Sequence, residues 1–69
     1  MSTTYEKLGE RVRKLRKKKG ITQEKLAELI GRDPRTIVAL EAGKRNPTLK
    51  TIQKIAKALK VKSTDILSF

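Results

Sequence analysis

The stretch TQEKLAELIGRDPRTIVALE, residues 22–41, decides the fold of this chain. Thr22 can accept a hydrogen bond from a free backbone N–H at the start of a helix, and Gly31 can adopt the left-handed conformation that ends one. Asp33 can cap the next helix, and Pro34 suits its first turn because its missing N–H is not needed there. The apolar side of the first helix is expected to consist of Leu26, Ala27, Leu29 and Ile30. The stretch therefore predicts two short helices joined by a tight turn.

The second of these helices is expected to have a buried side and a presented side. At about 100° per residue, the buried side consists of Ile37, Leu40 and Glu41. Arg35, Ala39 and Ala42 lie nearly opposite, and Val38 lies on the flank. A helix-turn-helix places its second helix in the DNA major groove with the N-terminal residues foremost, which would bring Arg35 to the base edges. An ordinary helical hairpin with a solvated outer face explains these residues equally well.

Charge favours the nucleic-acid alternative. The 69 residues include 18 Lys and Arg against 7 Asp and Glu, which gives a net charge of +11. A protein that neutralises phosphates releases counterions, so its affinity for nucleic acid should fall steeply as salt rises. Membrane surfaces also attract basic proteins, but no apolar run approaches the roughly 20 residues that span a bilayer, and residues 1–10 contain no signal-peptide core. We therefore expect double-stranded DNA, and no membrane, as the partner.

The side chains that most catalytic and metal sites need are missing. The chain contains neither cysteine nor histidine, so it can form no disulfide and no thiolate metal site. Glu24 and Glu28 lie four residues apart on one helix face and are interpreted as solubilising charges rather than as an acid–base pair. We expect no enzymatic activity, no metal and no cofactor. A chain without cysteine suits a reducing compartment, and we expect a cytoplasmic location.

Every apolar series in the chain has helical spacing. The breaks between helices fall at Gly20, Gly31, Gly43 and Asn46-Pro47. A first helix is expected over about residues 5–19, a fourth after Thr48, and a short fifth from Ser63 through Leu67. The first should bury Leu8, Val12 and Leu15, and the fourth should bury Leu49, Ile52, Ile55, Ala56 and Leu59. We predict a single domain, residues 1–69, with an all-α fold of five helices in a compact bundle.

Three further predictions concern the first helix. Thr3, with Glu6 three residues later, forms the pattern of a capping box. Gly9 lies inside the helix and is expected to permit close packing. Arg16 falls on the buried side of this helix, and Glu41 falls on the buried side of the third. Burial of either charge alone would cost several kcal/mol, so we predict that Arg16 and Glu41 form a structural ion pair.

With these helices in place, the chain resembles the phage-repressor and Cro-like helix-turn-helix family, also called the Xre family. The resemblance covers roughly residues 8–67, through LGERVRKLRKKKGITQEKLAELIG, then RTIVALEAGKRNP, then TLKTIQKIAKALKV. The landmarks that occur in family order are Arg16, Thr22-Gln23, Leu26-Ala27, Gly31, Glu41, Gly43 and Asn46-Pro47. The Arg16 and Glu41 positions match the family's structural ion pair.

The resemblance implies a lambda-repressor-like domain that docks as a homodimer on two half-sites about one turn of DNA apart. The residues predicted to bind DNA are Thr22, Gln23, Arg32, Arg35, Thr36, Val38, Ala39, Lys44, Arg45 and Asn46. Gln23 matches a position that contacts a backbone phosphate. The positions that match base-facing residues are Arg35, Val38 and Ala39, and residues 44–46 match a loop along the phosphates. Thr48 and Leu49, at the start of the fourth helix, could add backbone N–H donors to a phosphate.

Three positions depart from the family pattern. Ala39 stands where many members have a long polar side chain, so Arg35 is the only long polar side chain on the central reading face and suits a bidentate contact with guanine. Arg32 replaces a small apolar residue and is expected to leave the core, within reach of a phosphate. Lys60 stands where a glycine often ends the fourth helix. A left-handed lysine there would cost on the order of 1 kcal/mol, and the alternative is a looser helix end.

These features together predict a sequence-specific transcriptional regulator that binds operator DNA as a homodimer and represses, or both represses and activates, nearby promoters. No small-molecule effector is expected, because 69 residues leave no room for an effector domain. Phage Cro-like regulators and the controller proteins of restriction-modification systems both fit. The surface expected to form the dimer consists of Ile66, Leu67 and Phe69, for which contact with the core is the alternative.

A protein-binding adaptor, such as a coactivator bridging factor or an antitoxin, is the alternative function. Its motivation is the apolar character of Val38, Ala39 and Ala42 on the presented face. An adaptor would bind its protein partner as tightly in high salt as in low salt, whereas DNA binding would weaken by orders of magnitude.

Overall fold

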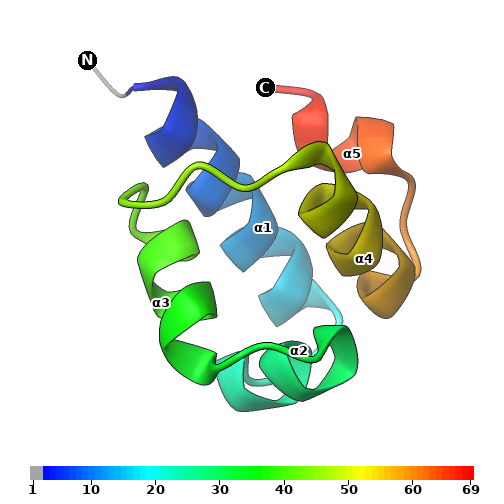
Figure 1. Cartoon of the computed structure of the whole chain (residues 1–69). Coiled ribbons are helices and arrows are strands. Elements are labelled where there is room, and N and C mark those ends of the chain that lie inside the picture. The colour runs from blue at the N-terminus through cyan, green and yellow to red at the C-terminus, as the bar shows by residue number, and fades with distance from the viewer. Residues whose placement is uncertain (1–2) are drawn as a thin grey trace.

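The computed structural model describes residues 3–69, and this part of the chain contains five α-helices and no strand. The helices are α1 (Thr4–Lys18), α2 (Gln23–Ile30), α3 (Pro34–Glu41), α4 (Leu49–Leu59) and α5 (Ser63–Leu67). Helix α1 packs against α3 and α5, while α2 packs against both α3 and α4 (Figure 1). The predicted all-α fold of five helices is confirmed. None of these helices has the length and apolar character needed to cross a bilayer.

The helix ends around the α2–α3 turn follow the predicted caps. Thr22 Oγ1 accepts a hydrogen bond of 3.0 Å from the backbone N–H of Lys25. Gly31 ends α2 in the left-handed conformation, with φ 68° and ψ 38°. Asp33 caps α3 through its side chain. Only Arg32 lies between the two caps, so the turn holds α2 and α3 at a short, defined separation.

The core takes residues from all five helices. Its members are Leu8, Val12, Leu15, Leu26, Ala27, Ile30, Ile37, Leu40, Ile52, Ile55, Ala56, Leu59 and Ile66. Two residues predicted to be buried are not, because Leu29 is 49% exposed and Leu49 is 61% exposed. Each lies about a quarter turn from the middle of its helix's buried face, so it points along the edge of the core. Thr51 is buried on α4, and its hydroxyl shares a 3.0 Å hydrogen bond with that of Thr48.

Helix α1 packs closely against α3 at Gly9, which is buried. A Cβ atom at this position would overlap the backbone carbonyl oxygens of Leu40 and Glu41, the second at 2.7 Å. The close packing predicted for Gly9 is confirmed. The missing side chain therefore sets the separation of α1 and α3, and with it the position of the C-terminal turn of α3.

Helix α4 ends at Lys60, which has φ 58° and ψ 43°. Within residues 3–69 it is the only non-glycine residue with a positive φ. The chain has therefore taken the left-handed cap rather than the looser helix end. The lysine side chain is exposed, so only its Cβ contributes the strain.

Lys60→Gly is expected to raise the free energy of unfolding by roughly 1 kcal/mol, because glycine enters the left-handed region without a Cβ clash. Urea unfolding followed by circular dichroism measures this difference. Lys57→Gly is the matched control, since it removes an exposed lysine from the same helix at a right-handed position and should lower stability by about the same amount. A Lys60→Gly variant that unfolds at lower urea than the parent would contradict the prediction.

Candidate nucleic-acid interface

The outer side of α3 carries the residues predicted to face bases. The Arg35 side chain is 91% exposed, and Val38 is also exposed, whereas Ala39 is half-buried. Ile37 and Leu40, on the opposite side of the helix, are buried in the core. Helix α3 therefore presents one side to solvent along its whole length.

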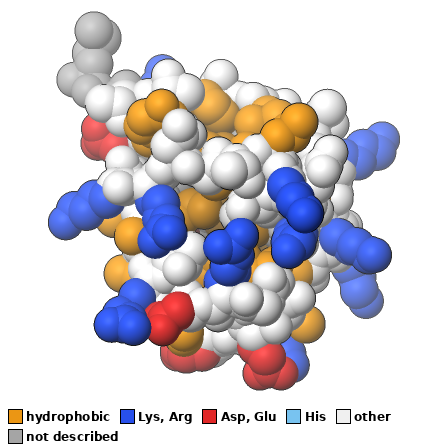
Figure 2. Space-filling model, in the orientation of Figure 1, with side chains coloured by type: hydrophobic (Ala, Val, Ile, Leu, Met, Phe, Trp, Pro, Cys, Tyr) orange, Lys and Arg blue, Asp and Glu red, His pale blue; other side chains and the backbone are white. Residues whose placement is uncertain are grey.

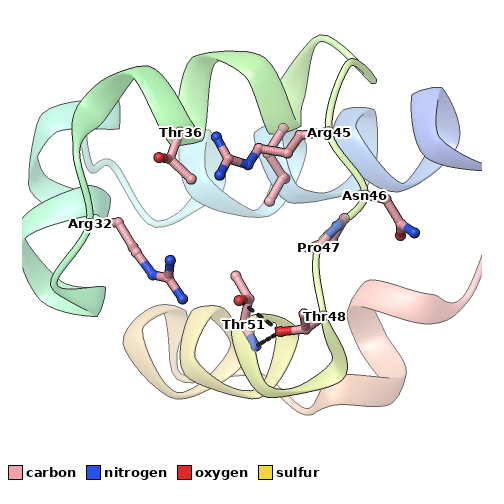
Figure 3. Close-up of a pocket in the computed structure, with 8 residues that line it drawn as sticks. Arg32, Thr36, Arg45, Asn46, Pro47, Thr48 and Thr51 are labelled. Carbon is pink, nitrogen blue, oxygen red and sulfur yellow. Dashed lines mark hydrogen bonds between the residues drawn. The ribbon is translucent and has the colours of Figure 1, made fainter.

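A hollow of about 120 Å³ lies beside this side of α3, between α3 and the start of α4 (Figure 3). Its lining residues are Arg32, Thr36, Leu40, Arg45, Asn46, Pro47, Thr48 and Thr51. Figure 3 shows Arg32, from the α2–α3 turn, and Arg45, from the α3–α4 loop, both directed toward the space above Thr51. The side chain of Asn46 points away from that space. We call this site, defined by Arg32, Thr36, Arg45, Thr48 and Thr51, the basic hollow.

The basic hollow belongs to a face rich in cations. Figure 2 shows Lys and Arg side chains spread over α3, the α3–α4 loop and α4, with Asp and Glu side chains around the edge. Lys44, Arg45 and Asn46 all lie in the loop after α3, and all three are exposed. The structure thus brings Arg32 and Thr36 together with Arg45 and Asn46 around the basic hollow, although the sequence separates them.

Thr22 and Gln23 lie at the start of α2, near the buried ion pair rather than at the basic hollow. Thr22 is exposed and uses its hydroxyl as the α2 cap. The Gln23 side chain is half-buried, and its Nε2 donates a hydrogen bond of 3.1 Å to Glu41 Oε1. An amide nitrogen carries two hydrogens, so this bond leaves the second one for another acceptor. Gln23 therefore ties α2 to α3 while remaining at the surface.

The two charges expected to pair lie together beneath Gln23. Arg16 Nε donates to Glu41 Oε2 at 2.6 Å, and Arg16 Nη2 donates to Glu41 Oε1 at 3.0 Å. The third guanidinium nitrogen, Nη1, donates to the backbone oxygen of Ile21 at 2.8 Å. The side chains of Arg16 and Glu41 are only 8% and 4% exposed. The hydrogen bonds with Glu41 raise the pKa of Arg16, although burial acts in the opposite direction. The pair joins α1 to the C-terminal turn of α3.

Asp33 has a second partner that sequence reasoning missed. Arg35 Nε donates to Asp33 Oδ1 at 3.1 Å, and Arg35 Nη2 donates to Asp33 Oδ2 at 3.0 Å. The hydrogen bonds between these side chains lower the pKa of Asp33 and raise the pKa of Arg35. The sequence signal was an acidic N-cap followed two residues later by an arginine. Asp33 has extended rather than helical backbone angles, so the rule that side chains two residues apart in a helix do not face each other does not apply to this pair.

Helices α2 and α3 are joined by a turn of residues 31–33. One side of α3 is exposed, with the basic hollow on one flank and the start of α2 on the other. This arrangement defines a helix-turn-helix DNA-binding domain. Comparison with known families agrees. The model of the helix-turn-helix family HTH_3 matches residues 12–66, and the chain belongs to this Cro/C1-type family. Its members are DNA-binding domains of transcription regulators.

Similar proteins are found in archaea and bacteria. An uncharacterized HTH-type transcriptional regulator from Archaeoglobus fulgidus is 44% identical over 59 residues, which cover 86% of this chain and 84% of that protein. The control protein C.BamHI from Bacillus amyloliquefaciens is 42% identical over 62 residues, covering 88% and 76% of the two chains. The crystal structure of the restriction-modification controller protein C.AhdI from Aeromonas hydrophila has a TM-score of 0.88 at 40% identity and covers 90% of both chains. The chain is a transcriptional regulator of the helix-turn-helix type.

Proposed function

We propose that this protein is a homodimeric repressor that reads operator DNA by placing α3 in the major groove. The observation that carries the proposal is the position of Arg35, which is 91% exposed on the first turn of α3 and lies on the same helix as the wall of the basic hollow. In a helix-turn-helix the N-terminal residues of the second helix contact base edges. Two of the similar proteins are controllers by name, which supports a role in control through site occupancy.

Phosphates on the two sides of the groove have separate binding groups in this proposal. On one side, Arg32 and Arg45 converge on the basic hollow from different segments, and the first backbone N–H groups of α4 adjoin it. Thr36, Lys44 and Asn46 extend that set, and all are at least partly exposed. On the other side, Thr22 and Gln23 begin α2. Phosphate contacts position a domain on the duplex without reading its sequence.

Few groups remain to read bases. Ala39 offers no hydrogen bond, although Ala39 and Val38 can touch a thymine methyl group. Arg35 can donate two parallel hydrogen bonds to O6 and N7 of guanine, which is the most specific contact available to this side chain. We therefore expect the protein to read few base pairs, with its main preference for one guanine in each half-site.

The expected dimer surface needs one correction. Ile66 has 0% exposure and belongs to the core, because α5 packs this residue against α1 and α4. Leu67 and Phe69 are exposed and leave an apolar surface beside α1. We propose that a second copy covers these two residues, which would place two α3 helices on successive half-sites.

Selection of binding sites from a random duplex pool at about 0.15 M salt tests the proposal. The parent should enrich a two-fold symmetric motif, and Arg35→Ala should lose the guanine preference, by about 5- to 150-fold in relative affinity. Lys44→Ala is the control, because loss of a phosphate contact should weaken all sequences alike and keep the motif. Binding without an enriched motif, abolished by modest added salt, would contradict the proposal and point to charge attraction with a protein as the specific partner.

A further inference from the structure

The pair of Asp33 and Arg35 occupies only one edge of the guanidinium. Nε and Nη2 of Arg35 face the carboxylate, at 3.1 Å and 3.0 Å from its two oxygens. A guanidinium is planar and carries five N–H donors in fixed directions. The edge formed by Nη1 and the second hydrogen of Nη2 therefore carries two parallel donors that Asp33 does not use. Two parallel donors at this spacing match O6 and N7 of guanine.

Asp33 is itself anchored to the helix. Its Oδ1 accepts a hydrogen bond of 2.8 Å from the backbone N–H of Arg35, which is the N-cap interaction of α3. The carboxylate is thus held by the helix start and in turn holds the guanidinium. A long arginine side chain otherwise samples many rotamers, and ordering it before binding reduces the entropy lost on contact. The ion pair therefore orders the Arg35 side chain and still leaves it exposed to solvent.

A carboxylate at this position has no advantage for simple attraction to DNA. Phosphates repel it, and it cancels one positive charge on the reading face. Capping does not require it either, because Ser, Thr and Asn cap helices about as well as Asp. The hydrogen bonds from Arg35 lower the pKa of Asp33, so the carboxylate keeps its charge to a more acidic pH than an isolated aspartate would. Asp33 thus weakens binding to DNA of any sequence but orders the one long base-facing side chain. Such a residue is suited to discrimination between bases.

We propose that Asp33 is a positioning residue for base recognition, which holds Arg35 with its Nη1–Nη2 edge outward and so confines its contact to guanine. The proposal rests on the proposed reading of DNA by α3. Asp33 acts through Arg35 and need not touch a base. Its removal should relax the choice of base while strengthening binding to DNA of any sequence.

The test compares the parent, Asp33→Asn and Asp33→Ser on the selected duplex and on the same duplex with adenine in place of the guanine. All three residues cap a helix, so thermal melting should be nearly unchanged. Serine is too short to hold the guanidinium, and asparagine offers one oxygen instead of two. The ratio of affinities for the two duplexes should fall at least fivefold for Asp33→Ser and by an intermediate factor for Asp33→Asn, while both variants bind random duplex more tightly.

The outcomes separate this inference from the proposed function. Tighter binding to both duplexes with an unchanged ratio would mean that Asp33 only masks charge, and it would overturn the inference alone. A parent that shows no guanine preference, or a preference that survives in Arg35→Ala, would overturn both. Loss of folding would lower both affinities together, so it cannot mimic a change in their ratio.

Discussion

Glu41→Ala is expected to lower the free energy of unfolding by about 3–5 kcal/mol. The substitution would leave the Arg16 guanidinium buried without a counter-charge and would remove hydrogen bonds of 2.6 Å and 3.0 Å. It would also remove the acceptor for Gln23. Small domains have a stability of about 0.05–0.15 kcal/mol per residue, or roughly 3–10 kcal/mol for this chain, so much of the variant should be unfolded at ambient temperature.

Thermal melting by circular dichroism measures this effect, and Arg16→Ala should show a similar loss. The double variant Arg16→Met/Glu41→Leu should be less destabilised than either single variant, because it leaves no unpaired charge in the interior. Glu28→Ala is the control. It breaks an exposed ion pair of 3.5 Å with Lys25 and should change stability by less than about 0.5 kcal/mol. A Glu41→Ala melt that overlays the parent would refute the structural role.

The second large effect is expected at Gly9, where alanine should lower the free energy of unfolding by about 3 kcal/mol. This figure is at the upper end for overpacking because the new Cβ meets backbone rather than a movable side chain. The carbonyl oxygen of Glu41 would lie 2.7 Å from it, and that of Leu40 lies closer still. The two helices must separate to admit the methyl group. The better helix propensity of alanine offsets only about 1 kcal/mol of the loss.

Gly20→Ala provides the comparison for Gly9→Ala. Gly20 has φ 70°, and no atom lies within 4 Å of the position that a Cβ would take there, so alanine costs only left-handed strain of about 1 kcal/mol. Urea unfolding of both variants should give Gly9→Ala a free energy of unfolding well below that of Gly20→Ala. The reverse order would show that α1 and α3 can move apart freely, and that the position of α3 is not set by this contact.

Both large effects concern the same part of the molecule. Gly9 and Arg16 of α1 each contact the C-terminal turn of α3, and Gln23 connects that turn to α2. The exposed side of α3 carries Arg35. The contacts that stabilise the domain are thus also the contacts that hold the proposed reading helix in place. Variants that loosen them should lose DNA affinity without any change at the DNA-facing surface.

Local features of the chain could be predicted because they depend on residues close in sequence. The caps at Thr22, Gly31 and Asp33 involve backbone groups no more than four residues away, and each was predicted correctly. Helical spacing also gave the direction in which most apolar residues point. It was wrong at Leu29 and Leu49, because periodicity defines a direction around one helix but not where the neighbouring helices stop.

The amino-acid sequence by itself determined the five helices, the tight turn, the basic charge and the pairing of Arg16 with Glu41, since the spacing and burial cost of these residues leave few alternatives. Only the tertiary structure decided that Arg32 and Arg45 share one hollow, that Ile66 lies in the core, and that Gln23 bonds Glu41. Those contacts depend on how far apart and at what angle whole helices pack, which is set by the combined shape of the core and by no single segment.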